Sequence, residues 1–361
     1  MIISRTPFRI SFFGGGTDYP PWYREHGGKV LGTAINKYCW ITCRYLPPFF
    51  EHRFRVVYSK IEDCARVEDI AHPAVREVLR HVGVAQGVEI HHDGDLPARS
   101  GIGSSSSFAV GMLHAIHALK GYMPTKVELA REAIQLEQDI LREAVGSQDQ
   151  VFAAHGGLNV VNFLQNDEIV VTPVTLRPER LRKLNANLML FFTGISRTAS
   201  AIAKAYTQDL GAKGASLLAM TRMVDQALDI LRAGELDDFG RLLHEAWHAK
   251  RSLDRNISTS YVDEIYEAAR SAGALGGKLL GAGGGGFVLV YARPEAQARV
   301  KAALGKFIQV PFHFDFSGSR IVFFDREEDF SEQSLLRDAS VIAPFRDADE
   351  PVGQARIRSS T

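Results

Sequence analysis

The chain has 361 residues, which is long enough for two domains with a core each, and 45% of them are hydrophobic and 23% charged. Its 42 Lys and Arg residues balance 42 Asp and Glu residues, so no overall field favours nucleic acid or a membrane, and local basic residues must meet any anionic substrate. Three cysteines, no apolar run of about 18 residues and no signal-peptide pattern lead us to expect a cytoplasmic protein.

The first half of the chain mixes β-rich and helical patterns. Alternating or β-branched runs predict strands over residues 1–13, 29–35, 38–44, 54–58, 88–92, 157–163 and 169–174. Helical spacing of apolar residues predicts helices over 73–81, 104–120 and 125–143. The helix over 104–120 carries few charges, so we expect it to be buried.

Charged residues and a proline over 177–186 interrupt the apolar pattern, and a second part of the chain follows. Strands are predicted there over 188–193, 278–280, 287–291 and 309–316, and helices over 199–233, 235–253, 259–272 and 294–304. Because strands and helices do not alternate strictly, the pattern favours an α+β fold over a doubly wound sheet.

The strand over residues 1–13 ends in three glycines. Glycine lets a ligand approach the backbone closely, which makes Gly15, Gly16, Thr17 and Asp18 candidate substrate-binding residues. Asp18 could accept hydrogen bonds from sugar hydroxyls. Arg9 could hold a phosphate or lower the pKa of a neighbouring carboxyl group. A plain hairpin turn in which Asp18 caps the next segment explains the motif equally well.

Residues 97–107 read Pro-Ala-Arg-Ser-Gly-Ile-Gly-Ser-Ser-Ser-Ser and lead directly into the helix predicted over 104–120. Small residues let backbone N–H groups turn inward, the hydroxyls add donors, and the helix directs its positive end at the same point. These are the components of a phosphate-binding loop. A flexible Gly/Ser linker is the alternative, but a linker should separate two domains rather than join a strand to a helix.

Two acidic residues follow this loop. Glu137 stands on the helix predicted over 125–143, and Asp149 lies in the sequence Gly-Ser-Gln-Asp-Gln. If both converge on a phosphate site, they could serve as a magnesium ligand and a proton acceptor. A solvated helix face followed by a turn is the alternative interpretation.

A third glycine-rich segment, residues 281–286, formally matches G-x-G-x-x-G. A dinucleotide-binding loop must lead into a helix, whereas this segment leads into a strand, so we reject that function. We expect a glycine-rich hairpin that forms one wall of an active site, with Gly283 and Gly284 near the substrate. The sequence contains no P-loop motif.

His244-Glu245-Ala246-Trp247-His248 matches the zinc-protease motif H-E-x-x-H. The apolar residues around it share one helix face, which places both histidines beside a buried stripe rather than in a cleft. We therefore disfavour a zinc site.

The three glycine-rich motifs, in this order, resemble those of the GHMP kinases, the superfamily of galactokinase, homoserine kinase and mevalonate kinase. The resemblance covers Pro7 to Asp18, Pro97 to Ser106 and Lys278 to Phe287. It implies an N-terminal domain like domain 2 of ribosomal protein S5 over residues 1–183. It also implies a ferredoxin-like C-terminal domain over residues 184–361, with ATP and Mg²⁺ as cofactors.

The resemblance also assigns roles to residues. Ser105 and Glu137 would correspond to the family's magnesium-binding Ser and Glu, and Asp149 to its proposed catalytic base. Arg9 would keep Asp149 ionised and neutralise charge during the transfer. The ATP-binding candidates are Pro97, Arg99, Ser100, Gly101, Ile102, Gly103, Ser104, Ser105, Ser106 and Ser107.

Within the family, the form Gly-Gly-Thr-Asp-x-Pro resembles kinases of D-glycero-D-manno-heptose 7-phosphate and, more distantly, of L-fucose. We therefore expect phosphorylation of the anomeric C1 hydroxyl of this small sugar phosphate, by a monomer or a homodimer. The 7-phosphate needs a basic partner, for which we choose Arg197 from the candidates Lys29, Lys37, Arg44, Arg197, Lys250 and Arg251. The alternatives are a fucokinase or galactokinase of a free sugar, and a non-catalytic, sugar-sensing homologue.

Overall fold

The computed structural model describes residues 1–195, 213–325 and 330–338, and these build two separate β-sheets. The larger sheet has the order β12-β1-β2-β5-β3-β4, and β6 extends it from β2 toward β7. Its strands are β1 (Ile2–Phe13), β2 (Gly28–Tyr45), β3 (Phe54–Val57), β4 (Ile61–Cys64), β5 (Val88–Gly94), β6 (Leu158–Phe163), β7 (Ile169–Pro173) and β12 (Arg320–Phe324). The smaller sheet has the order β11-β8-β10-β9, formed by β8 (Leu188–Phe192), β9 (Gly276–Leu279), β10 (Phe287–Tyr291) and β11 (Ile308–Val310).

One long strand, β2, replaces the two strands predicted over 29–35 and 38–44. Its register with β1 shifts between Pro7 and Phe8, so that Pro7 lies opposite Tyr38 and Phe8 opposite Ile35. Proline has no N–H to donate to the ladder, which explains an irregularity at this point. The strand continues through residues 36 and 37, which lie between the two predicted strands.

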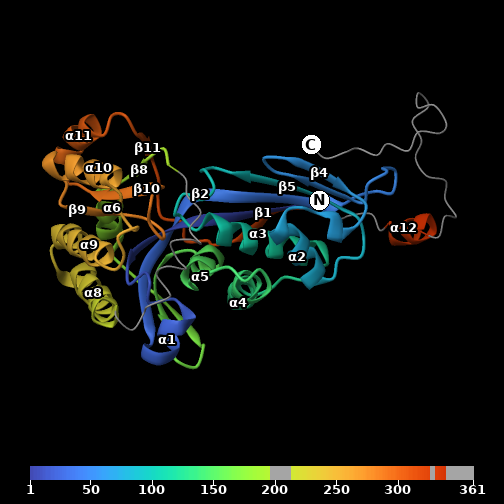
Figure 1. The fold of residues 1–361 in the computed structure, drawn as a ribbon, viewed down its shortest axis with the longest axis horizontal. Helices are drawn as coiled ribbons and strands as arrows, with labels where there is room; N and C mark the ends of the chain where they lie inside the picture. Colours follow the sequence, from blue (N-terminus) through green and yellow to red (C-terminus); the bar gives the residue numbers. More distant parts are fainter. Residues whose placement is uncertain (196–212, 326–329, 339–361) are drawn as a thin grey trace.

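Helices cover one face of the larger sheet. Figure 1 shows α2 (Pro73–Val82), α3 (Ser104–Leu119), α4 (Lys126–Gln135) and α5 (Gln148–His155) together along this side. Helix α3 packs on β1 and β2 and is buried along nearly its whole length, as we expected. The close approach requires Gly111, where a Cβ atom would lie 2.8 Å from the Thr6 hydroxyl oxygen.

The smaller sheet lies at the other end of the molecule and carries its own helices, as Figure 1 shows. Its helices are α8 (Gly214–Ala233), α9 (Leu236–Arg251), α10 (Ser260–Ser271) and α11 (Pro294–Ala303). The helices predicted over 235–253, 259–272 and 294–304 are confirmed. The first part of the helix predicted over 199–233 lies outside the described residues.

The chain then returns to the larger sheet. Strand β12 pairs with β1, Phe314 forms a bridge with Ile35, and the Thr6 and Ser319 hydroxyl groups are 2.8 Å apart. The strand predicted over 309–316 is correspondingly shorter, because only Ile308–Val310 belong to the smaller sheet. The α+β class is confirmed.

Several short elements were absent from the sequence prediction. They are α1 (Pro20–His26), β4, α5, α6 (Pro178–Ala186), β12, α12 (Ser331–Asp338) and a 3₁₀ turn over Val67–Asp69. Each is too short for a clear apolar period, so its conformation depends on tertiary packing. Across the described ranges, no helix is both long and apolar enough to cross a membrane.

Candidate active site

The Gly/Ser run of residues 97–107 forms a tight loop that opens α3. Gly103 is the N-terminal cap of this helix at φ +74°, and Gly101 also has a positive φ. A Cβ atom on Gly103 would lie 3.2 Å from Arg9 Cγ and 3.4 Å from Asp149 Oδ2. The segment is therefore packed against these two side chains and does not separate two domains. We call it the phosphate loop after the role that the sequence predicts for it.

Internal hydrogen bonds hold the phosphate loop in shape. The Ser100 hydroxyl donates to Pro97 O at 2.5 Å, and the Arg99 backbone N–H donates to Ser104 Oγ at 3.1 Å. Arg99 itself has φ +58°, which a non-glycine residue adopts rarely. The Ser107 hydroxyl donates to Pro7 O at 2.9 Å and ties the start of α3 to β1.

Arg9 and Asp149 form a two-point ion pair beneath the phosphate loop. Arg9 Nε donates to Asp149 Oδ1 and Arg9 Nη2 donates to Asp149 Oδ2, both at 2.7 Å. The third arm of the guanidinium, Nη1, donates to Gly101 O at 2.8 Å. Arg9 is only 4% exposed, and Asp149 occupies the first turn of α5 rather than the turn of the alternative interpretation. This arrangement fixes the carboxylate relative to the loop.

Glu137 reaches the other side of the phosphate loop. It lies in a π-helical turn, Leu136–Ile140, that continues α4 and presents its carboxylate to three neutral donors. Ser105 Oγ donates at 2.8 Å, Ser106 Oγ at 2.6 Å and Gln150 Nε2 at 2.5 Å. Glu137 is 1% exposed, and burial raises its pKa to about 7 although the three donors lower it. The sequence had placed Ser106 among the ATP-binding candidates rather than beside Glu137, and it had not indicated Gln150.

Asp18 lies nearby and is closed in by backbone. Its carboxylate accepts from the N–H groups of Gly16 at 2.8 Å and Gln148 at 3.3 Å, and a Cβ atom on Gly146 would clash with it at 1.9 Å. Burial is the main reason that the Asp18 pKa is raised, and the Asp149 charge adds to the effect. The Thr17 hydroxyl group, in contrast, donates to the carbonyl oxygens of Gly14 and Lys29 and thereby stabilises the local backbone.

The glycine-rich segment 281–286, called the glycine loop, interlocks with the phosphate loop. A Cβ atom on Gly281 would lie 2.4 Å from Gly101 Cα, and one on Gly286 would lie 2.1 Å from Ser100 O. Phe287 N–H donates to Ser100 O at 3.2 Å. Gly283 and Gly284 pack on Ile257 instead. The loop therefore joins the smaller sheet directly to the phosphate loop.

Two lysines complete this junction. Lys278 Nζ donates to Phe12 O at 2.8 Å and is buried, and burial, Lys250 and Arg9 together hold its pKa well below the usual range. Lys250 Nζ donates to Gly281 O. Sequence reasoning did not single out Lys278, because one lysine among Gly and Leu residues has no pattern. Lys250 was only one of six possible phosphate partners.

Three of the other candidate partners of the substrate phosphate form ion pairs with acidic residues. Lys29 pairs with Asp225 at 2.8 Å, Arg44 with Glu89 at 2.6 Å, and Arg251 with Asp263 at 3.0 Å. Arg197, our choice for the substrate phosphate, lies outside the described residues.

The H-E-x-x-H segment does not form a metal centre in the described part of the chain. His244 Nδ1 lies 2.6 Å from the Tyr266 hydroxyl oxygen, and no group of three His, Cys, Asp or Glu residues suited to a metal ion occurs among the described residues.

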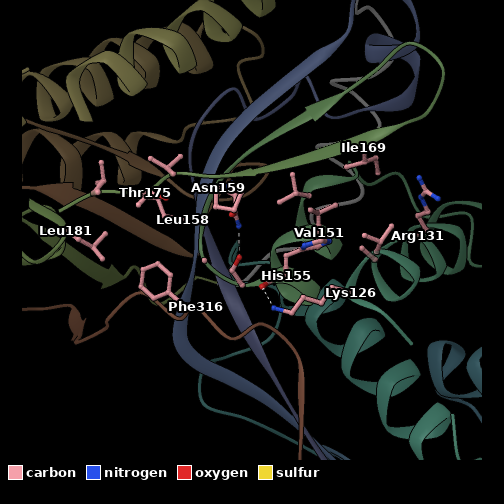
Figure 2. Close-up of a pocket in the computed structure, with 18 residues that line it drawn as sticks. Lys126, Arg131, Val151, His155, Leu158, Asn159, Ile169, Thr175, Leu181 and Phe316 are labelled. Carbon is pink, nitrogen blue, oxygen red and sulfur yellow. Dashed lines mark hydrogen bonds between the residues drawn. The ribbon is translucent and has the colours of Figure 1, made fainter. Parts of the chain in front are cut away.

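A cavity of about 600 Å³ lies at the opposite end of α5 from Asp149. Figure 2 shows its lining, which includes Lys126, Arg131, His155 and Phe316 among mostly apolar residues. Lys126 Nζ donates to His155 O at 2.8 Å and to Ser317 O at 2.9 Å. None of the predicted site residues that the structure describes lines this cavity, so the cavity is separate from the candidate site.

Comparison with known proteins gives matches over most of the chain. The family model described as GHMP kinases N terminal domain matches residues 69–157, and the model described as GHMP kinases C terminal matches residues 227–309. A D-glycero-alpha-D-manno-heptose 7-phosphate kinase of Campylobacter jejuni is 28% identical over 333 residues, which cover 84% of this chain and 93% of that protein.

A second relative and a solved structure are also similar to this chain. The bifunctional fucokinase/GDP-fucose pyrophosphorylase of Arabidopsis thaliana is 26% identical over 81% of this chain, and the chain spans 30% of that protein's length. The crystal structure of a D-glycero-D-manno-heptose 1-phosphate kinase from Bacteroides thetaiotaomicron superposes with a TM-score of 0.74 at 24% identity, over 90% of this chain and 100% of the other.

Proposed function

We propose that this chain, which belongs to the GHMP kinase family, transfers the γ-phosphoryl group of ATP to the anomeric C1 hydroxyl of D-glycero-D-manno-heptose 7-phosphate. The sequence resemblance to this family was correct, and membership makes the protein a phosphotransferase with an alcohol acceptor. The identity of the sugar and the position of the hydroxyl group are the parts that we propose.

The three-armed contact of Arg9 carries the proposal. One guanidinium holds both oxygens of Asp149 and the carbonyl of Gly101, so the carboxylate stands at a set position beside the phosphate loop. Phosphoryl transfer asks little covalent chemistry of a protein and depends mainly on positioning and charge neutralisation. A carboxylate and a cation held together beside a phosphate-binding loop supply both.

We assign the steps as follows. The acceptor hydroxyl oxygen forms a bond to the γ-phosphorus while the bond from that phosphorus to the bridging oxygen of ADP breaks. Asp149 accepts the hydroxyl proton or orients the hydroxyl group, and Arg9 balances the negative charge. The backbone of Gly101 to Ser104 and the hydroxyl groups of Ser104 and Ser105 bind the ATP phosphates, aided by the N-terminal end of α3. Ser106 and Ser107, which we had also expected to bind ATP, are buried, and their hydroxyl groups donate to Glu137 and to Pro7 O instead.

Glu137 and Ser105 fit a magnesium ion. Both offer hard oxygen ligands, and within the described part of the chain the buried Glu137 carboxylate has neutral donors and no cationic partner. Magnesium sites typically combine one or two carboxylates with substrate phosphates, so two protein ligands suffice. When bound, the ion neutralises charge on the β- and γ-phosphates.

The choice of acceptor rests on relatives and on the first motif. The Campylobacter jejuni relative is named for heptose 7-phosphate, and the fucokinase relative shares less of its length with this chain. A fucokinase or galactokinase of a free sugar remains the second candidate, favoured by the fucokinase and galactokinase names among the relatives. We also keep Arg197 as the partner of the 7-phosphate, and the division into domains 1–183 and 184–361, as proposals.

A panel assay tests the proposal. Purified protein is incubated with ATP, Mg²⁺ and either heptose 7-phosphate, heptose, L-fucose or galactose, and ADP release is measured. We expect turnover with heptose 7-phosphate that exceeds that with the free sugars. Turnover with L-fucose or galactose alone would establish the second candidate, and no ADP release with any acceptor would indicate a non-catalytic homologue.

A further inference from the structure

Lys250 holds the start of the glycine loop, which lies against the phosphate loop. It stands near the C-terminal end of α9 and donates from Nζ to Gly281 O, with Leu279 O at 3.5 Å. Gly281 is the residue of the glycine loop that lies against Gly101. The lysine therefore holds the part of the glycine loop that meets the phosphate loop.

The charges around Lys250 come from both halves of the chain. Arg9 on β1 and Lys278 on β9 repel its ammonium group, and Asp18 and Asp149 attract it. Among the described residues, Lys250 forms no direct ion pair with a carboxylate. Its ammonium group therefore responds to the whole junction, in which the basic side chains of Lys250, Arg9 and Lys278 lie near two carboxylates.

We propose that Lys250 is a positioning residue of the transfer reaction, whose ammonium group sets the glycine loop against the phosphate loop. A hydrogen bond from a charged donor is about twice as strong as one from a neutral donor, so loss of the proton loosens this contact. The inference rests on the proposed kinase activity, because the largest effect that we expect is a loss of turnover in that reaction.

The proposal includes a pH dependence with a defined direction. Burial, followed by the Arg9 charge, lowers the pKa of Lys250 to about 8, and Asp18 and Asp149 oppose that shift. The ammonium group is thus present below about pH 8 and is lost as the pH rises through that value. Turnover falls over the same range, and an arginine at this position keeps its charge there.

The test compares three variants with the wild type. Lys250→Met removes the donor, Lys250→Arg keeps the charge, and Lys126→Met is the matched control. Lys126 is also a partly buried lysine that donates to two backbone carbonyls, and burial lowers its pKa too, but it lies at the far end of α5. Turnover and the KM values for ATP and acceptor are measured from pH 6 to pH 10, with melting temperatures as a check on folding.

We expect Lys250→Met to lower kcat by about 10- to 100-fold with little change in the KM for ATP, and Lys126→Met to stay within about threefold of the wild type. Lys250→Arg should retain most activity at pH 7 and lose the alkaline fall near pH 8. A Lys250→Met variant as active as the Lys126→Met control, or an unchanged alkaline limb in Lys250→Arg, would overturn the proposal.

A measurement without turnover separates this inference from the proposed function. Carbon-13 NMR of labelled lysine side chains, assigned with Lys250→Arg, reports the titration of Lys250 directly. A midpoint near pH 8 supports the charge state that the proposal needs, and an ordinary value contradicts it. If the wild type releases no ADP with any acceptor, the proposed function fails whatever this midpoint is.

Discussion

Two carboxylates reach the phosphate loop from its two sides, and their partners differ in kind. Asp149 is held by the guanidinium of Arg9 at two points, whereas Glu137 is held by the hydroxyl groups of Ser105 and Ser106 and the amide of Gln150. Each set donates at least one hydrogen bond to each oxygen of its carboxylate, but only the first also supplies a positive charge.

The pKa of Glu137 reflects this difference. Three neutral donors do not offset burial, so its pKa rises to about 7. A bound cation would supply the charge that is missing on the Glu137 side, whereas the Asp149 side already contains one. This contrast supports a metal-binding role for Glu137 and a role toward the acceptor hydroxyl for Asp149. The predictions below test the two sides separately.

The largest effect is expected on the Asp149 side. Asp149→Asn removes the proton acceptor and one half of the ion pair, and we expect turnover to fall by roughly 10²–10⁴-fold while nucleotide still binds. ADP release and nucleotide binding by calorimetry measure the two quantities. Asp167→Asn, which breaks an exposed ion pair with Arg24, is the control and should leave turnover unchanged. Near-normal turnover in Asp149→Asn would remove the catalytic role.

The Glu137 side should respond to magnesium instead. Glu137→Ala leaves Asp149 and Arg9 in place, so we expect the Mg²⁺ concentration for half-maximal rate to rise by about tenfold or more, with partial recovery at high Mg²⁺. Glu132→Ala is the matched control on α4, because Glu132 pairs with His117 away from the phosphate loop. A magnesium titration identical to that of the wild type would contradict the assignment.

Two glycine variants separate the effect of packing between Gly103 and the Arg9–Asp149 pair from the effect of backbone strain. Gly103→Ala and Gly121→Ala both place a side chain at nearly the same positive φ, +74° and +78°, but nothing lies within 4 Å of a Cβ atom on Gly121. We expect both to lose about 1 kcal/mol of unfolding free energy in urea titrations. Only Gly103→Ala should also reduce turnover, since its Cβ displaces Arg9 and Asp149. Equal turnover in the two variants would show that this packing is irrelevant to activity.

The last of these predictions concerns the pH dependence of stability, and no change in turnover is needed as its readout. The Glu137 pKa is raised in the folded protein, so the folded state binds a proton more tightly than the unfolded state does, and this group lowers stability as the pH rises from about 4.5 to about 7. Glu137→Gln removes that penalty. We expect the magnesium-free variant to gain on the order of 1–3 kcal/mol over the wild type at pH 8 relative to pH 4.5, measured by urea unfolding. A difference that does not change with pH would indicate that Glu137 is not buried in its charged form.

Local sequence information predicted the elements that carry long apolar periods and the loop that precedes α3. It also predicted that Glu137 and Asp149 belong with this loop, through a family resemblance rather than through spacing. It did not predict that Asp149 opens a helix, because Gln148–His155 is a helix of 8 residues held by tertiary packing. It likewise missed the π-helical turn that presents Glu137.

The largest gaps concern contacts between distant segments. Lys278 meets Phe12 across 266 positions of the chain, and Lys250 meets Gly281 only because α9 packs on β9. The return of β12 to β1 joins two segments from opposite ends of the sequence. No local period encodes such pairings, since they depend on how the two sheets are placed relative to each other.

Identification of the product tests the central claim most directly. The wild-type protein is incubated with ATP, Mg²⁺ and D-glycero-D-manno-heptose 7-phosphate, and the mixture is examined by phosphorus-31 NMR with proton coupling. We predict one new phosphomonoester signal, coupled to the anomeric proton, in equal amount to the ADP formed, and its absence with Asp149→Asn. A phosphate on another hydroxyl group, or ADP without a new sugar phosphate, would contradict the account.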